Sequence, residues 1–325
     1  MSRRGRFALL VLGATATIAL GLLVGAAVSG PSALVAAIRE PDSPVGAIVL
    51  RLRLPRVLLA FSVGAGLGLC GAALQALVRN PLADPYLLGL SGGAGLGAVL
   101  AIAAAASRPW VVPAAAFAGA LGAVGLVYRL SVVGGRRLDP RILLLAGVVV
   151  GSFAAAVMSA IITLAPVSQL RSAILWLLGG FGAASWRALA IYTAYAIVPA
   201  GLLLLHARQL DLLVLGEEPA RYLGAELERT KRVVYFAASL LTAAGVAVSG
   251  IIGFVGLVVP HAMRRLIGPL HGPLLPAVAL ASGGFVVVAD AAARTLFAPL
   301  ELPVGVLTAL VGVPLFAVLL RRTLR

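Results

Sequence analysis

The stretch RLPRVLLAFSVGAGLGLCGAALQALVRNPLADPYLLGLSGGAGLG, from Arg53 to Gly97, decides the fold. It contains two apolar runs, 57–78 and 86–106, that are separated only by a short turn. Each run has about 20 residues, which is the length at which a helix crosses a bilayer. Because a membrane-spanning segment must satisfy its own backbone hydrogen bonds, the two runs predict transmembrane helices.

The rest of the chain repeats this pattern. Its 325 residues are 61% hydrophobic and only 11% charged, with a mean hydropathy of +1.08. A soluble domain is about a quarter charged. The apolar runs are continuous rather than alternating, which excludes a β-barrel. We therefore expect an all-α integral membrane protein, with residues 1–325 forming a single polytopic domain of ten transmembrane helices: 7–28, 57–78, 86–106, 110–130, 142–165, 187–206, 232–250, 251–266, 274–294 and 303–320.

Three of these spans, the first, seventh and eighth, differ from the others. The start of the chain resembles a signal peptide, but its apolar run is long and further spans follow, so we expect a retained first helix. The seventh and eighth spans are separated only by SGIIGF, residues 249–254, so we expect one of them to be short or broken.

Charge sets the orientation. Ten spans place both termini on one side, and 18 of the 26 lysines and arginines fall on that side. The positive-inside rule therefore predicts that both termini are cytoplasmic. The net charge of +15 comes mainly from these residues between apolar runs, so it indicates topology and contact with a lipid bilayer rather than nucleic acid.

The two halves of the chain show a weak internal similarity. At an offset of 179 residues, Arg53, Gly66, Gly71 and Pro81 fall on residues of the same type: Arg232, Gly245, Gly250 and Pro260. Inverted repeats of this kind are common in transporters. An inverted repeat of helices 2–5 and 7–10, or coincidence in a Gly-rich chain, would both account for four matches.

Several kinds of site are excluded. A phosphate-binding GxxxxGK[ST] loop requires a lysine after glycine, yet the only lysine, Lys231, follows Thr230. If ATP drives this protein, ATP and Mg bind to another subunit and the chain itself binds no cofactor. The three histidines are scattered, without HExxH or CxxC, so we predict no metal site. The Gly-rich stretch 89–97 opens an apolar span and is better explained by helix packing.

The positions of the acidic residues disfavour ion-coupled transport. Ion-coupled transporters usually carry acidic side chains within the membrane. Here Asp290 lies four residues before Arg294, a spacing at which the two side chains share a helix face and pair. No span carries an obvious proton relay. An ion-gradient-driven secondary transporter or a channel stays open as the alternative function, while a membrane enzyme would need a polar cluster that the sequence lacks.

One polar interruption, LGEEPARYLGAELERTKR from Leu215 to Arg232, breaks the second half of the chain. From Pro219 onward, PARYLGAEL predicts a short helix: Pro219 suits its first position, and Glu217 and Glu218 lie near the positive end of its dipole. A small apolar stripe recurs at helical spacing: Ala220, Leu223 and Leu227. Since the acidic residues disfavour an anionic membrane surface, we expect this short cytoplasmic helix to dock on a protein partner.

Four stretches together carry a resemblance to a known family: LGEEPARYLG, the opening stretch from Arg53 to Gly97, GIIGFVGLVVPHAMRRLIG (250–268) and ADAAARTLFAPLELPVGVLTALVGVPLF (289–316). The chain resembles the permeases of iron-chelate, haem and cobalamin ABC importers (the FecCD type, or type II importers) from about Leu50 to Leu320. The resemblance implies a homodimer in the bacterial inner membrane that works with two ATPase subunits and an extracytoplasmic binding protein. It implies no enzymatic activity, but alternating-access import of a ferric siderophore, haem or cobalamin, without indicating which.

The resemblance also assigns roles to positions in this chain. The cytoplasmic coupling segment, about 211–231, would contact the ATPase through Leu215, Gly216, Glu217, Glu218, Ala220, Leu223 and Gly224. The expected docking residues for the binding protein are Arg53, Arg56 and Arg294. The pathway and its cytoplasmic gate would be formed by Asp139, Pro140, Arg141, Val150 and Ala154, and the Asp-Pro-Arg sequence leaves the chemistry of this gate open. The stretch 169–186 resembles a short extracytoplasmic helix.

Overall fold

The computed structural model describes residues 3–25, 28–106, 108–133, 137–224 and 226–323, and most of them are helical. In chain order the elements are α1 (Arg3–Leu23), α2 (Pro31–Arg39), α3 (Pro44–Gly46), η1 (Ala47–Arg53), α4 (Leu54–Leu77), η2 (Pro85–Leu88), α5 (Leu90–Ala103), α6 (Val111–Ser131), β1 (Val132–Val133), β2 (Arg137–Leu138), α7 (Pro140–Leu164), α8 (Val167–Leu177), α9 (Trp186–Leu205), α10 (Ala207–Leu215), α11 (Glu217–Tyr222), α12 (Leu227–Ser249), α13 (Val255–Ile267), α14 (His271–Thr295) and α15 (Val304–Thr323).

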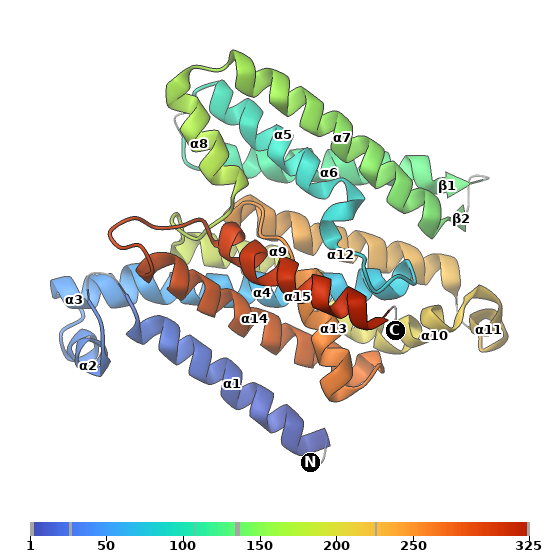
Figure 1. Cartoon of the computed structure of the whole chain (residues 1–325), viewed down its shortest axis with the longest axis horizontal. Helices are drawn as coiled ribbons and strands as arrows, with labels where there is room; N and C mark the ends of the chain where they lie inside the picture. The colour runs from blue at the N-terminus through green and yellow to red at the C-terminus, as the bar shows by residue number, and fades with distance from the viewer. Residues whose placement is uncertain (1–2, 26–27, 107, 134–136, 225, 324–325) are drawn as a thin grey trace.

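Helix α4 lies at the centre of the bundle. It packs against α14, α12, α13 and α9, and most of its residues are buried. Helices α5, α6 and α7 pack on one another and form a second group beside α12, while α1 lies along the outside of α14 (Figure 1). The two short strands pair antiparallel and join α6 to α7.

The prediction of an all-α membrane protein is confirmed. Each of the ten predicted spans coincides with a helix. Within the described ranges, seven helices are long and apolar enough to cross a membrane, and Leu90–Ala103 and Val304–Val318 are shorter apolar helices. The eighth predicted span is short, as expected: α13 has 13 residues and follows a turn in which Phe254 has a φ of 68°. The count of ten crossings stays a prediction.

Small residues let these helices approach closely. A Cβ atom on Gly71 of α4 would overlap the backbone of Gly256 in α13, and one on Gly93 of α5 would overlap the backbone of Gly119 in α6. Contacts of this kind are typical of membrane helices. Because lipid is as apolar as the side chains, the hydrophobic effect does little to bring the helices together, and close packing between small residues does so instead. The packing role predicted for the Gly-rich stretch 89–97 is therefore confirmed.

The bundle has two distinguishable ends. Helix α1 begins, and α15 ends, at the same end as α10, α11 and the strands β1 and β2 (Figure 1). Helices α2, α3 and α8 lie at the opposite end (Figure 1). We call these the α11 end and the α8 end. The arrangement places the termini, the predicted coupling segment and the predicted gate turn together.

The residue pairs of the weak sequence repeat do not all lie in equivalent structures. Gly71 lies inside α4, whereas its counterpart Gly250 is the C-cap of α12 with a φ of 66°. Pro81 lies in the turn after α4, whereas Pro260 lies inside α13. Gly66 and Gly245, by contrast, both lie inside helices, α4 and α12. The offset of 179 residues therefore pairs like structures only in part, and the inverted repeat stays a prediction.

Candidate functional site

The predicted coupling segment forms two short helices, α10 and α11, that meet at Gly216. The φ of Gly216 is 107°, a value that an L-amino acid with a side chain rarely adopts, so glycine permits the sharp turn. Helix α11 begins at Glu217, two residues before the predicted start at Pro219. Gly224, with a φ of 78°, follows the helix, and Ala225 lies outside the described residues.

The predicted apolar stripe does not form one helix face, because Ala220 lies in α11, Leu223 is the C-cap and Leu227 is the first residue of α12. Ala220 and Leu227 are buried within the chain, whereas Leu223 is exposed together with Leu215. Tyr222 is 92% exposed and Glu218 is also exposed. The segment is thus anchored by small buried contacts and presents large apolar side chains outward, as a protein-docking surface does.

Helix α10 is fixed to the bundle by an acidic residue. The carboxylate of Asp211 accepts a hydrogen bond from the backbone N–H of His271, at 2.8 Å, and lies 2.7 Å from Nδ1 of the same histidine. His271 is the first residue of α14, so one side chain both caps α14 and holds the start of the coupling segment.

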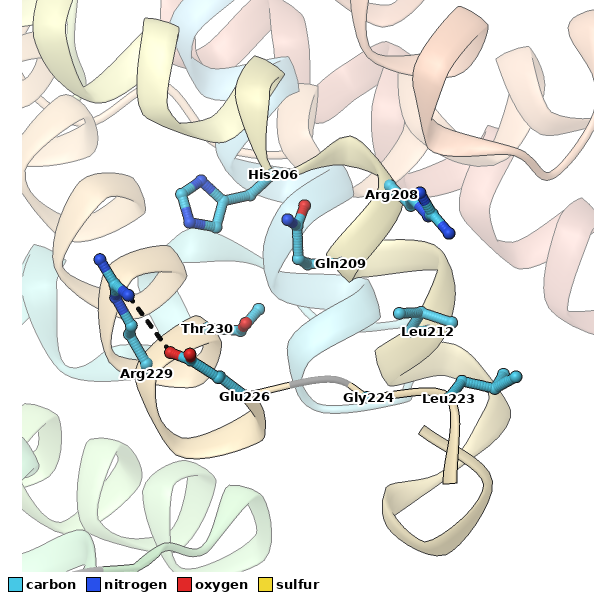
Figure 2. A pocket seen from close by; sticks show the side chains of 9 residues that line it. All are labelled: His206, Arg208, Gln209, Leu212, Leu223, Gly224, Glu226, Arg229 and Thr230. Atoms are coloured by element: carbon cyan, nitrogen blue, oxygen red, sulfur yellow. Dashed lines mark hydrogen bonds and ion pairs between the residues drawn. The ribbon is translucent and has the colours of Figure 1, made fainter. Parts of the chain in front are cut away.

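A pocket of about 520 Å³ opens beside α11 (Figure 2). Its lining comes from the α9–α10 junction, from α10 and from the start of α12: His206, Arg208, Gln209, Leu212, Leu223, Gly224, Glu226, Arg229 and Thr230. Arg229 pairs with Glu226 at 3.2 Å across one side of it. The pocket therefore combines a basic rim with the exposed Leu223 of the coupling segment.

Behind the coupling segment lies a buried lysine. Nζ of Lys231 donates to Oε1 of Glu217 at 2.6 Å, to Oε1 of Glu228 at 3.1 Å and to the carbonyl oxygen of Leu138 at 3.1 Å. Lys231 is 2% exposed. Its hydrogen bond lowers the pKa of Glu217, with further lowering by the charges of Arg79 and Arg221. The side chain of Glu217 therefore connects α11 to α12, and does not act as a cap of α11 or project freely into solvent.

Sequence reasoning missed this role for Lys231. From the sequence alone, Lys231 served to exclude a phosphate-binding loop, and no contact of its side chain was predicted. The signal available was the Glu228–Lys231 spacing of three residues, which places both side chains on one helix face. The partners Glu217 and Leu138 lie 14 and 93 residues away, so local spacing does not indicate them.

The predicted gate turn is a helix start. The side chain of Asp139 accepts from the backbone N–H groups of Arg141, at 2.8 Å, and Ile142, at 3.4 Å, and so caps α7. Pro140 occupies the first position of the helix and is buried, whereas Arg141 is exposed. The turn is thus a rigid N-cap with one exposed cation. Its gating role stays a prediction.

The two predicted pathway residues on α7 face another helix. Val150 and Ala154 are buried, at 8% and 3% exposure, where α7 crosses Gly89 and Gly92 at the start of α5. The opposite face of α7 is exposed and apolar, and consists of Leu145, Val149 and Phe153 at helical spacing. If α7 lines a pathway in this conformation, that exposed face is the one available.

The three predicted docking arginines all bind within the chain, near the α8 end. Arg53 donates to the carbonyl oxygens of Leu22 (2.8 Å) and Val28 (2.6 Å), and is 6% exposed. Arg294, equally buried, donates to the carbonyls of Gly21 and Val24. Both therefore hold the C-terminal end of α1, where a helix dipole favours cations.

Arg56 forms ion pairs instead. Its Nη2 atom lies 2.9 Å from Asp290 and 2.9 Å from Glu301. Asp290 also pairs with Arg294 at 3.1 Å, which confirms the pairing predicted from their spacing of four residues. Glu301 is half exposed, so Arg56 is the docking candidate nearest to solvent.

Comparison with known proteins decides between the candidate classes. The sequence matches the profile of the FecCD transport family over residues 11–322. The chain belongs to the FecCD transport family. It is a permease subunit of an ABC importer and not an enzyme, and the ATPase of such importers is a separate subunit. The resemblance predicted from the sequence is confirmed, and the relatives favour an importer permease over an ion-driven transporter.

The relatives carry several cargoes. The chain is 43% identical over 280 residues to the hemin transport system permease HmuU of Yersinia pestis, which covers 85% of this chain and 83% of that protein. It is 43% identical over 274 residues to the cobalamin import permease BtuC of Halobacterium salinarum, covering 84% and 73%. It is 41% identical over 279 residues to YvrB of Bacillus subtilis, an uncharacterized ABC transporter permease, covering 85% and 79%.

A solved structure agrees with this assignment to the family. The fold superimposes with a TM-score of 0.86 on a structure described as an inward-facing conformation of a metal-chelate type ABC transporter. That chain is 30% identical, and the match covers 98% of this chain and 99% of the other. The family and its apolar helices make this a multi-pass protein of the inner membrane. Across the described ranges no group of three His, Cys, Asp or Glu side chains is placed to hold a metal ion.

Proposed function

We propose that the chain forms, as a homodimer, the membrane pathway for a metal chelate: a ferric siderophore, haem or cobalamin. Two ATPase subunits, which bind ATP and Mg, attach at the α11 end, and an extracytoplasmic binding protein attaches at the α8 end. The observation that carries this proposal is the exposed apolar surface of α10 and α11, located at the same end as both termini. The positive-inside count assigns that end to the cytoplasm.

The ATPase contact uses the whole exposed side of the coupling segment. Leu215, Tyr222 and Leu223 supply apolar anchors, and Glu218 and the basic rim of the adjacent pocket supply charge around them. An apolar centre with a charged rim is the usual anatomy of a protein–protein interface. Gly216 and Gly224 set the angle at which α11 is presented, and Ala220 anchors it.

Transport proceeds by alternating access. Closure of the ATPase pair upon ATP binding moves the coupling segments, and the cavity between the two permease copies changes the side on which it opens. The exposed face of α7, with Leu145, Val149 and Phe153, lines that cavity. Such a wall makes only weak contacts with a bulky chelate, which must also leave. The Asp139–Arg141 turn then gates the cytoplasmic side.

Docking of the binding protein is centred on Arg56. An acidic side chain on that protein would compete with Glu301 for the guanidinium group, whereas Arg53 and Arg294 would first have to release α1. These two arginines keep a docking role only if the end of α1 rearranges on contact. Net affinity from such exposed pairs is small, so they serve mainly orientation and association rate.

The deciding experiment reconstitutes the chain with its ATPase in proteoliposomes. ATP hydrolysis and uptake are measured with binding protein that has been loaded with cyanocobalamin, hemin or a ferric siderophore. We expect one loaded form to stimulate hydrolysis and to be taken up. Uptake that follows an ion gradient and needs no ATPase would instead establish the secondary-transporter alternative.

A further inference from the structure

Lys231 lies at the meeting point of three elements. Its ammonium group has three N–H donors, and each donates to a different partner: Glu217 of α11, Glu228 of its own α12 and the backbone carbonyl of Leu138 in β2. A buried cation is stable only when it is fully paired. Here every donor is used, and two carboxylates lie against the single positive charge.

The peptide of Leu138 is held from both sides. Its N–H donates to Oε2 of Glu228 at 2.8 Å, and its carbonyl oxygen accepts from Lys231 at 3.1 Å. The Leu138 side chain is also buried. The next residue, Asp139, caps α7, and its own N–H donates to the carbonyl oxygen of Ser131 at 3.1 Å. The start of α7 therefore cannot shift without displacing the peptide that Lys231 and Glu228 bind.

On its other side, this network holds a short helix with few attachments to the rest of the chain. Helix α11 has only six residues and lies between two glycines with positive φ, Gly216 and Gly224. Besides its contacts with α10, it is attached through the buried Ala220 and the ion pair from Glu217 to Lys231. A displacement of α11 thus acts on Lys231 directly, and through Lys231 on Leu138.

We propose that Lys231 is the positioning residue that transmits movement of the coupling helix α11 to the gate turn at the start of α7. The proposal rests on the function proposed above, because it presumes that an ATPase moves α11. A lysine suits this role because the three N–H donors of its ammonium group bind three elements at one point. The alternative is that Lys231 only stabilises the fold.

The test separates these two roles. Lys231→Met keeps the length of the side chain and removes all three donors. In proteoliposomes with the ATPase and binding protein, we expect ATP hydrolysis to persist while the number of chelates imported per ATP falls roughly tenfold, a usual size for a coupling between two sites. Cyanocobalamin, hemin and a ferric siderophore serve as probes. The matched control is Arg232→Met, the exposed neighbouring cation, which donates to the carbonyl oxygen of Glu228 in its own helix.

A second readout does not depend on the cargo. A nitroxide on Arg141→Cys reports the gate turn, and the native Cys70 is buried and stays unlabelled. Addition of ATP, Mg and vanadate should change the spectrum in the otherwise wild-type complex and not in Lys231→Met. If Lys231→Met fails to fold, Glu217→Gln is used instead. It removes the charge that attracts α11 to Lys231, leaves the bonds of Lys231 to Glu228 and Leu138 in place, and should lower chelates per ATP with little change in melting temperature.

The outcomes are distinct. A folded Lys231→Met, or Glu217→Gln, with the wild-type number of chelates per ATP and a wild-type spectral change would overturn the role of Lys231. A wild-type complex without any ATP-dependent uptake would overturn the proposed function itself. Equal loss of hydrolysis and uptake, with a lowered melting temperature, would show that Lys231 is structural only.

Discussion

The guanidinium group of Arg56 lies 2.9 Å from the carboxylate of Asp290, although the two residues are 234 positions apart in the chain. Asp290 is 1% exposed and also binds Arg294. One carboxylate therefore joins α4 to α14 between two cations near the α8 end. Glu301 extends the cluster from Arg56 toward the surface.

Asp290→Asn should destabilise the protein strongly. The amide keeps the shape of the side chain but leaves two largely buried arginines without their shared counter-charge. Breaking a buried pair in this way costs about 3–5 kcal/mol. Thermal unfolding in detergent or nanodiscs measures it. The matched control is Asp42→Asn, because Asp42 pairs with Arg51 at 2.8 Å on the exposed surface and should matter little. Equal melting temperatures for the two variants would contradict the assigned role.

The arginines also show which contacts can be predicted from the sequence and which cannot. Spacing of four residues on one helix correctly predicted the Asp290–Arg294 pair. The resemblance predicted outward-facing arginines, yet Arg53 and Arg294 bind carbonyls of α1. A sequence gives the length and polarity of each helix, but the partner of a long side chain depends on which helices pack together. For the same reason the Arg56–Asp290 contact was not predicted.

Gly71→Ala should disrupt the crossing of α4 and α13. A methyl group there would overlap the backbone of Gly256, which cannot move as a side chain can. Overpacking of a core costs about 1–3 kcal/mol or more. We expect a lower melting temperature and reduced expression. The control is Gly122→Ala on α6, where nothing lies within 4 Å, so the change should be neutral or slightly stabilising. A stable Gly71→Ala would show that the two helices can separate.

Tyr222→Ser combined with Leu223→Asp should prevent assembly with the ATPase and leave the permease folded. Both side chains are exposed in the chain, so neither contributes to its core. Loss of two apolar anchors at an interface typically costs about 2 kcal/mol or more each. Co-purification of the ATPase measures assembly, and the melting temperature of the isolated permease serves as the control. Normal co-purification would place the ATPase contact elsewhere.

The coupling segment marks a second limit of prediction. The sequence predicted a short helix from Pro219 with an apolar stripe of Ala220, Leu223 and Leu227. The helix is present but ends at Tyr222, so Ala220 lies in α11, Leu223 is its C-cap and Leu227 begins α12. The sequence did not predict that two of the three would be buried, because helical spacing assigns residues to a face but does not say what the face contacts. Nor did it predict that the acidic Glu217 would turn inward to Lys231, since that contact depends on the path of α12 beneath α11.

The attachment of α11 should depend on pH in a defined direction. The hydrogen bond from Lys231, with the charges of Arg79 and Arg221, holds the pKa of Glu217 below its ordinary value of 4.5. A lowered pKa means that the ion pair stabilises the docked helix fully above that ordinary value and progressively less as pH falls through the lowered one. Hydrogen exchange of the α11 amides, corrected for intrinsic rates, should therefore stay constant from about pH 8 to about pH 5 and accelerate below about pH 4. Glu217→Gln should exchange faster throughout and lose this acid-dependent step. A midpoint near neutral pH in the wild-type chain would mean that Glu217 does not hold α11 to Lys231.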